Sequence, residues 1–198
     1  MVKFPKLPFL RSSGKGARQD KNRSKEGIRL LAALLVCYPE IESLSYSPER
    51  QEIQLNFMIR GKVSEKKRIA LQPRYQEAFD AYNAMLGVKT GLWYWLVEDF
   101  GVCVRLRYGR PLQALSRGEL EFLAEFLTDY FDDQLVCDAH SLDVLDPQFA
   151  EAQSSVLDQT LYRVQQLPPT DHLAGLREDE RVVVYNRDMR IERKSEKQ

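Results

Sequence analysis

The strongest constraint on the fold is a run of alternating apolar and polar residues. Every second residue from Ile53 to Ile59 is large and apolar, and the residues between them are polar or Met58. A side-chain period of two is that of a β-strand with one buried face. The turn-forming sequence Ser47-Pro48-Glu49-Arg50 directly precedes this run and follows Leu44 and Tyr46. The sequence therefore predicts an antiparallel hairpin here.

A second hairpin is predicted between Leu92 and Tyr108, and its register decides which face carries the two tryptophans. A two-residue or four-residue loop pairs Trp95 with Leu106 or Val104, whereas a three-residue loop pairs it with Arg105. Only an even-numbered loop gathers the apolar residues of both strands on one face, as a half-buried sheet requires. We therefore expect both tryptophans in the core.

Helical spacing of apolar residues, together with capping signals, predicts four helices. Ser24 and Ser116 are candidate N-cap residues, and Glu119 completes a capping box with Ser116. The four segments are residues 24–38, 73–86, 116–133 and 147–167. The β-branched run Val182–Tyr185 predicts a last strand. The expected class is α+β: an antiparallel sheet from two β-hairpins plus a C-terminal strand, packed by four helices.

The formal net charge of zero hides a strong asymmetry along the chain. Residues 1–29 carry nine Lys and Arg against two acids, whereas positions 118–162 carry eleven acids and no Lys or Arg. Residues 1–23 are also nearly free of core-type side chains after Leu10. We expect a disordered basic arm over 1–23, a single α+β domain over 24–186 and a frayed C-terminal tail over 187–198.

The composition argues against membrane and secreted classes. The longest apolar run, Leu30–Tyr38, is less than half of the roughly 20 residues that a transmembrane helix needs, and the first residues lack the apolar stretch of a signal peptide. Three scattered cysteines, Cys37, Cys103 and Cys137, are too few for a disulfide framework. We expect a cytoplasmic protein without a membrane span.

The sequence offers no recognisable catalytic constellation. Cys137 and His140 stand close together, but a zinc site needs three or four ligands with compatible spacing. Cys137 follows two apolar residues and is better explained as a small buried side chain than as a nucleophile. We therefore expect neither a metal nor a cofactor, and we expect a non-enzymatic protein, with an enzyme assembled from dispersed residues left as an alternative.

An acidic stripe is the clearest candidate for a partner-binding surface. Its members fall at helical spacings i, i+4, i+8 and i+11 and are Glu121, Glu125, Asp129 and Asp132. Like charges at these spacings destabilise an isolated helix slightly, so helix stability does not explain them. The stripe is either a solvated face or a docking surface for a basic partner.

Basic residues suggest a second kind of partner. The candidates for contact with nucleic acid lie in the arm, after the first hairpin and on the second hairpin: Lys15, Arg18, Lys21, Arg23, Lys66, Lys67, Arg68, Arg105 and Arg107. Phosphate contacts by such clusters give salt-dependent binding. Tyr94 shares the face of Arg105 and Arg107, an arrangement that can stack a base.

Two functions from different classes remain after these exclusions. The first is a cytoplasmic binding or regulatory domain that docks a macromolecular partner, in the first instance a protein, through charge-segregated surfaces. The alternative is an RNA-associated or ribosome-associated accessory protein that uses the basic arm and the 60–68 basic cluster.

Overall fold

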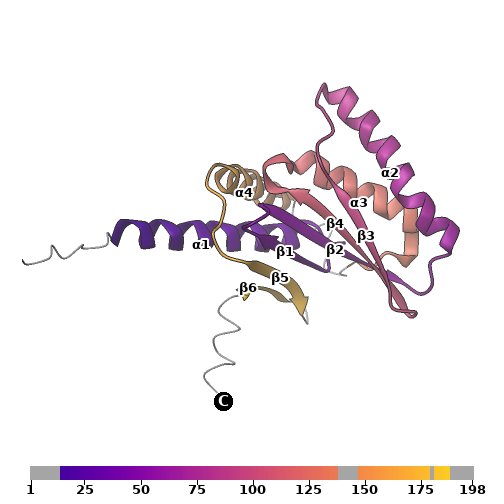
Figure 1. Ribbon diagram of the computed structural model, residues 1–198, viewed down its shortest axis with the longest axis horizontal. Coiled ribbons are helices and arrows are strands. Elements are labelled where there is room, and N and C mark those ends of the chain that lie inside the picture. The colour runs from indigo at the N-terminus through magenta and orange to yellow at the C-terminus, as the bar shows by residue number, and fades with distance from the viewer. Residues whose placement is uncertain (1–13, 138–146, 179–180, 188–198) are drawn as a thin grey trace, which may run out of the picture.

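A computed structural model describes the backbone of residues 14–137, 147–178 and 181–187, and the side chains from residue 22 to 137, 153 to 178 and 181 to 187. Figure 1 shows the arrangement of its helices and strands. In chain order the elements are α1 (Gly14–Cys37), β1 (Ser43–Ser47), β2 (Glu52–Arg60), α2 (Glu65–Leu86), β3 (Tyr94–Asp99), β4 (Cys103–Pro111), η1 (Leu112–Ala114), α3 (Arg117–Phe131), η2 (Asp132–Gln134), α4 (Pro147–Gln166), β5 (Leu173–Glu178) and β6 (Arg181–Asn186).

The strands form one antiparallel sheet in the order β3-β4-β2-β1-β5-β6. All four helices contribute side chains to one apolar core, which includes every second residue of β2 from Ile53 to Ile59. The helices therefore cover a single face of the sheet and leave the other face open. The predicted α+β class is confirmed. None of the helices in the described ranges combines the length and apolar composition that a bilayer crossing requires.

The first hairpin and two helix starts form as the sequence predicts. Ser47 pairs with Glu52 across the turn between β1 and β2. The hydroxyl of Ser116 accepts a hydrogen bond from the backbone N–H of Glu119 at 3.1 Å and so caps α3. Helix α4 begins at Pro147, the residue predicted for its first position.

Helix α1 begins earlier than predicted. Its first residue is Gly14 rather than Ser24, so residues 14–23 of the predicted disordered arm are helical. Once the apolar turns of a helix have formed, each added residue costs little, and the Ala, Arg, Gln and Lys residues of this segment are good helix formers. The hydroxyl of Ser24 donates to the carboxylate of Asp171 instead of capping the helix. Residues 1–13 and 188–198 lie outside the described residues.

Helix α2 also begins earlier, at Glu65, and contains Pro73 in its interior. Ser64 is its N-cap and accepts from the backbone N–H of Lys67 at 3.3 Å. The predicted start at about Pro73 is therefore wrong, because the Ser64 cap lets the helix begin at Glu65. Gly87 ends the helix in a left-handed conformation with φ 68°, as the sequence predicts.

The second hairpin places the tryptophans on the expected face but in another register. Trp95 pairs with Tyr108 rather than with Leu106 or Val104, because the tight turn lies at Gly101 and Val102. The 8% exposure of Trp95 agrees with a core position. The face that a side chain occupies depends only on whether the number of loop residues is odd or even. The residue that it pairs with on the other strand depends on the position of the turn.

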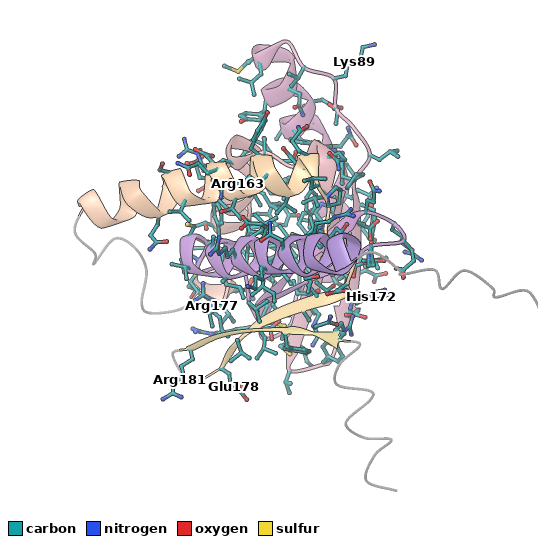
Figure 2. All side chains as sticks on the ribbon, turned by 90° about the vertical axis from the view of Figure 1, so that its left-hand side faces the viewer. Lys89, Arg163, His172, Arg177, Glu178 and Arg181 are labelled. Carbon is teal, nitrogen blue, oxygen red and sulfur yellow. The ribbon has the colours of Figure 1, made fainter. Side chains whose placement is uncertain are left out.

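The C-terminal part of the sheet is a hairpin. The sequence predicts one strand near Val182–Tyr185, which is β6, whereas β5 precedes it and pairs with both β1 and β6. In Figure 2, α1 lies between α4 and this hairpin. The guanidinium of Arg177 donates to the carbonyls of Tyr38 and Ile41 and so fastens β5 to the segment that follows α1.

Candidate partner-binding groove

Helix α2 rests on the sheet through aromatic rings. The ring of Tyr75 lies with its centroid 4.9 Å from that of Trp93, 5.5 Å from that of Trp95 and 5.7 Å from that of Tyr108. The three contacts are edge-on, the geometry that aromatic quadrupoles favour. These large side chains hold α2 away from the strands and fix its position.

A buried polar network anchors the same region. Arg110 and Glu119 form an ion pair whose side chains are 5% and 4% exposed, with Nη2 2.8 Å from Oε2. The hydroxyl of Tyr75 donates to that of Tyr108, which in turn donates to Glu119 at 2.7 Å. Burial raises the pKa of Glu119, while the Arg110 guanidinium and the Tyr108 hydroxyl oppose this rise. The network is saturated and buried, so it supports the structure rather than forming an open site.

The outer side of α2 carries a wide apolar depression of about 610 Å³. A second depression of about 320 Å³ continues from it into the space between α2 and α3. We call the two together the α2–α3 groove. Its lining residues are Ser64, Glu65, Lys66, Lys67, Ile69, Ala70, Pro73, Arg74, Asp129 and Tyr130.

The middle of the α2–α3 groove is apolar. The side chain of Ile69 is 68% exposed, and Pro73 follows one turn later on the same side of α2. Of the twelve large apolar residues that are exposed in the described part of the chain, nine lie between Ile69 and Val102. Of these nine, only Ile69 lines the groove, so its apolar surface consists mainly of Ile69, Ala70 and Pro73.

The rim of the groove is cationic and is ordered by Tyr130. The ammonium of Lys67 lies 5.5 Å from the centroid of the Tyr130 ring, and the guanidinium of Arg74 lies 5.8 Å from it. The Tyr130 hydroxyl donates to the backbone carbonyl of Lys67 at 2.7 Å. Burial raises the pKa of Tyr130, while the charge of Arg74 opposes this rise. The ring therefore holds two cations beside the apolar surface.

The predicted acidic stripe is exposed but shorter than expected. Glu121, Glu125 and Asp129 lie on the exposed side of α3, whereas Asp132 follows the end of this helix with φ 52° and leaves the stripe. Arg117 lies 3.5 Å from the carboxylate of Glu121. Asp129 lines the α2–α3 groove together with Lys66 and Lys67. The structure thus brings one predicted acid beside two predicted nucleic-acid contacts.

Three further candidates for nucleic-acid contact form ion pairs with acids. Arg68 pairs with Asp99 at 2.7 Å. Arg105 and Arg107 share the carboxylate of Glu98 at 3.5 and 3.3 Å. Both lie on the open face of the sheet, away from the groove, because their neighbours in β4 point into the core.

Tyr94, on the same open face, is engaged in a similar way. Its hydroxyl donates to Glu52 at 2.6 Å and accepts from Gln54 at 2.8 Å. Further along the sheet, Arg107 donates to Asn56 at 3.2 Å. A phosphate on this surface would compete with existing carboxylate and amide partners.

The described backbone of the predicted arm, residues 14–23, lies apart from the acidic stripe (Figure 1). Lys15, Arg18 and Lys21 belong to the first turns of α1, whose side chains are not described. Arg23 donates to the carbonyl of Pro168 at 2.8 Å. In Figure 1 the N-terminal end of α1 extends away from α3. The geometry does not bring these two charged segments together.

Of Cys137 and His140, the pair considered for metal or nucleophilic chemistry, only Cys137 belongs to the described residues. Cys137 is exposed, so the prediction of a buried side chain is wrong, and its pKa is raised mainly by desolvation, which disfavours the thiolate. His140 lies outside the described residues, while His172 contacts Glu49 at 2.8 Å. The described residues hold no cluster of three or more His, Cys, Asp or Glu side chains placed to bind a metal.

Sequence reasoning missed the apolar and aromatic parts of the groove. The sequence analysis did not name four of the groove residues as candidates for partner binding: Ile69, Pro73, Arg74 and Tyr130. Ile69 and Pro73 lie on the side of α2 opposite Leu71 and Tyr75. Apolar residues on two faces of one helix are the signal that could have revealed them. No family model matches this sequence, and no curated protein or solved structure is significantly similar to it.

Proposed function

We propose that this protein is a non-enzymatic binding domain that docks an acidic, partly apolar segment of a protein partner in the α2–α3 groove. The observation that carries the proposal is the apolar depression around Ile69 and Pro73, with Lys66 and Arg74 on its rim. An exposed apolar surface with a polar rim is the usual form of a protein interface.

The apolar part of the groove supplies the reason for a protein partner. Full burial of an isoleucine side chain stabilises a complex by roughly 1.5–3 kcal/mol. Ile69 is 68% exposed, so most of this free energy is available to a partner. A peptide segment with its own apolar side chains would bury this surface, whereas a sugar–phosphate backbone would not.

The charges of the groove supply the reason for an acidic partner. Three cations, Lys66, Lys67 and Arg74, line it against two acids, Glu65 and Asp129. A local excess of positive charge accelerates association with acidic segments and disfavours basic ones. The same cations could meet phosphates, so the RNA-associated alternative is an outcome that the experiment must separate.

The test is photo-crosslinking in cells of the source organism, with a photoreactive amino acid in place of Ile69. Tyr162 on α4 is the matched control position, because its 66% exposure is nearly that of Ile69. We expect protein adducts at position 69 that exceed those at position 162 by at least tenfold and decrease when Lys66→Glu and Arg74→Glu are added. Adducts of equal yield at both positions, or adducts that nuclease treatment removes, would contradict the proposal.

A further inference from the structure

Strand β3 has a free edge whose hydrogen-bonding groups can be assigned. It pairs with β4 on one side, and no other described strand pairs with it. The backbone N–H of Phe100 donates to the carbonyl of Cys103 at 2.9 Å, so Phe100 and Cys103 form a hydrogen-bonded pair. Such pairs alternate along antiparallel strands. The backbone groups of Trp95, Val97 and Asp99 therefore point outward from the sheet.

This edge lacks the protection that sheet edges usually have. Leu96 is 45% exposed on the open face and Val97 is 39% exposed on the helical face. Charged residues occur only at the end of the strand, at Glu98 and Asp99. An unpaired edge strand with apolar residues at its centre and without lysine or proline is a template for strand pairing.

We propose that a second copy of this chain binds here, with the two β3 strands antiparallel about a twofold axis at Leu96. The sheet then continues from one copy into the other. The pairing of the two strands uses no residue of the α2–α3 groove, so the proposal does not depend on the partner proposed for that groove.

The side chains of β3 favour this register. It places Leu96 opposite Leu96 of the second copy, Val97 opposite Trp95 and Glu98 opposite Tyr94, so no two carboxylates face each other. Shifting the axis to Glu98 would place two glutamates directly opposite each other, which is destabilising. A twofold interface has to be self-complementary, and the register at Leu96 meets this requirement.

The charges of α2 are self-complementary in the same arrangement. Contacts of Arg68 with Asp99 and of Tyr75 with Trp95 show that α2 runs antiparallel to its own β3. The first half of α2 is basic, from Lys66 to Arg74, and its second half carries Glu77 and Asp80. Because the two copies of α2 run in opposite directions, the basic half of each lies on the side of the acidic half of the other. This attraction supports the twofold pairing.

The first test measures the mass of the protein in solution by sedimentation velocity for the full chain and two variants. We expect the wild type and Val183→Lys, on the opposite edge strand β6, to form dimers at micromolar concentration. We expect Val97→Lys to weaken dimerisation at least tenfold with an unchanged circular dichroism spectrum. A wild type that stays monomeric up to about 100 μM, or a dimer that survives Val97→Lys, would overturn the proposal.

The second test examines the register by disulfide formation in a chain whose Cys37, Cys103 and Cys137 are replaced by serine. Residues opposite each other in a non-hydrogen-bonded pair have Cα atoms about 4.5 Å apart, within the range of a disulfide. With copper phenanthroline and oxygen as the oxidant, which accepts two protons and two electrons, Leu96→Cys should give a covalent dimer. The control variant Leu92→Cys should not form a covalent dimer, although Leu92 is 81% exposed in the wild type. A dimer in solution that forms no Leu96→Cys crosslink would overturn the register.

Discussion

At one end of the sheet α1 packs closely against β5 and α4, whereas at the other end α2 stands on aromatic rings above β3 and β4. The first contact is aliphatic, with four leucines of α1 that are at most 1% exposed: Leu30, Leu31, Leu34 and Leu35. Gly27 lets α1 approach so closely that a Cβ atom there would lie 2.5 Å from Leu173 and Pro169.

The two ends differ in what they leave exposed. Every ring–ring contact involves residues between Phe57 and Tyr108 or on α3, so none is found at the α1 end in the described residues. The same region holds nine of the twelve exposed large apolar side chains. Small and aliphatic side chains let α1 pack closely against its neighbours. Large aromatic rings hold α2 farther from the sheet, so the outer side of α2 stays exposed. The aromatic end is therefore the end suited to binding.

The largest effect is expected from the buried ion pair at the aromatic end. Glu119→Ala leaves Arg110 buried without its carboxylate, which costs about 3–5 kcal/mol in the free energy of unfolding. The double variant Arg110→Met, Glu119→Leu removes both charges and should recover most of this loss. Urea denaturation of the three proteins measures both values. A single variant that loses less than about 1 kcal/mol would show that the pair is not structural.

A smaller effect should distinguish close packing at the two ends. Gly27→Ala inserts a methyl group between α1 and two packed side chains, and overpacking of this kind costs about 1–3 kcal/mol. The nearest atoms to a methyl group in Gly109→Ala belong to the ring of Tyr94, a side chain on the open face that can rotate away at the expense of its hydrogen bonds with Glu52 and Gln54. Thermal denaturation should therefore rank Gly27→Ala as more destabilising than Gly109→Ala. The reverse order would contradict the proposed contrast between the ends.

The smallest effect concerns alkaline pH and the buried tyrosines. Burial raises the pKa of Tyr75 and Tyr108 well above the usual value near 10. Above pH 10 the unfolded chain therefore releases protons that the folded chain keeps, and stability falls as pH rises. Each such tyrosine contributes about 1.4 kcal/mol per pH unit.

Tyr108→Phe tests this slope. Unfolding curves between pH 9.5 and 11.5 should show a shallower loss of stability in the variant than in the wild type, whatever its stability at neutral pH. Equal slopes would mean that Tyr108 ionises normally in the folded protein.

Sequence reasoning identified the elements whose signals are local. The alternation from Ile53 to Ile59, the Ser116 cap and the Gly87 stop each depend on a few neighbouring residues, and each is present in the structure. Strand β5 was missed because Leu173, Ala174 and Gly175 are all buried and show no alternation. A strand whose burial does not alternate along the chain has no period of two to detect.

The candidate site was less accessible for a different reason. The sequence analysis found three groove residues by their charge: Lys66, Lys67 and Asp129. The side chains beside them in the groove come from distant parts of the chain. Tyr130 reaches Lys67 only after α2 and α3 pack together. The pairing of Arg105 and Arg107 with Glu98 likewise follows from the register of the hairpin, and that register depends on the position of one turn.

Pro73 affects how readily the middle turn of α2 opens to solvent. Because proline has no N–H, the carbonyl of Ile69 lacks its usual donor within the helix. We expect amide hydrogens in this turn to exchange with solvent faster than those around Phe79, where the helix is continuous. The carbonyl of Ile69 belongs to a residue that lines the groove, so a bound segment that donates a hydrogen bond there would join the two halves of α2 into one protected helix.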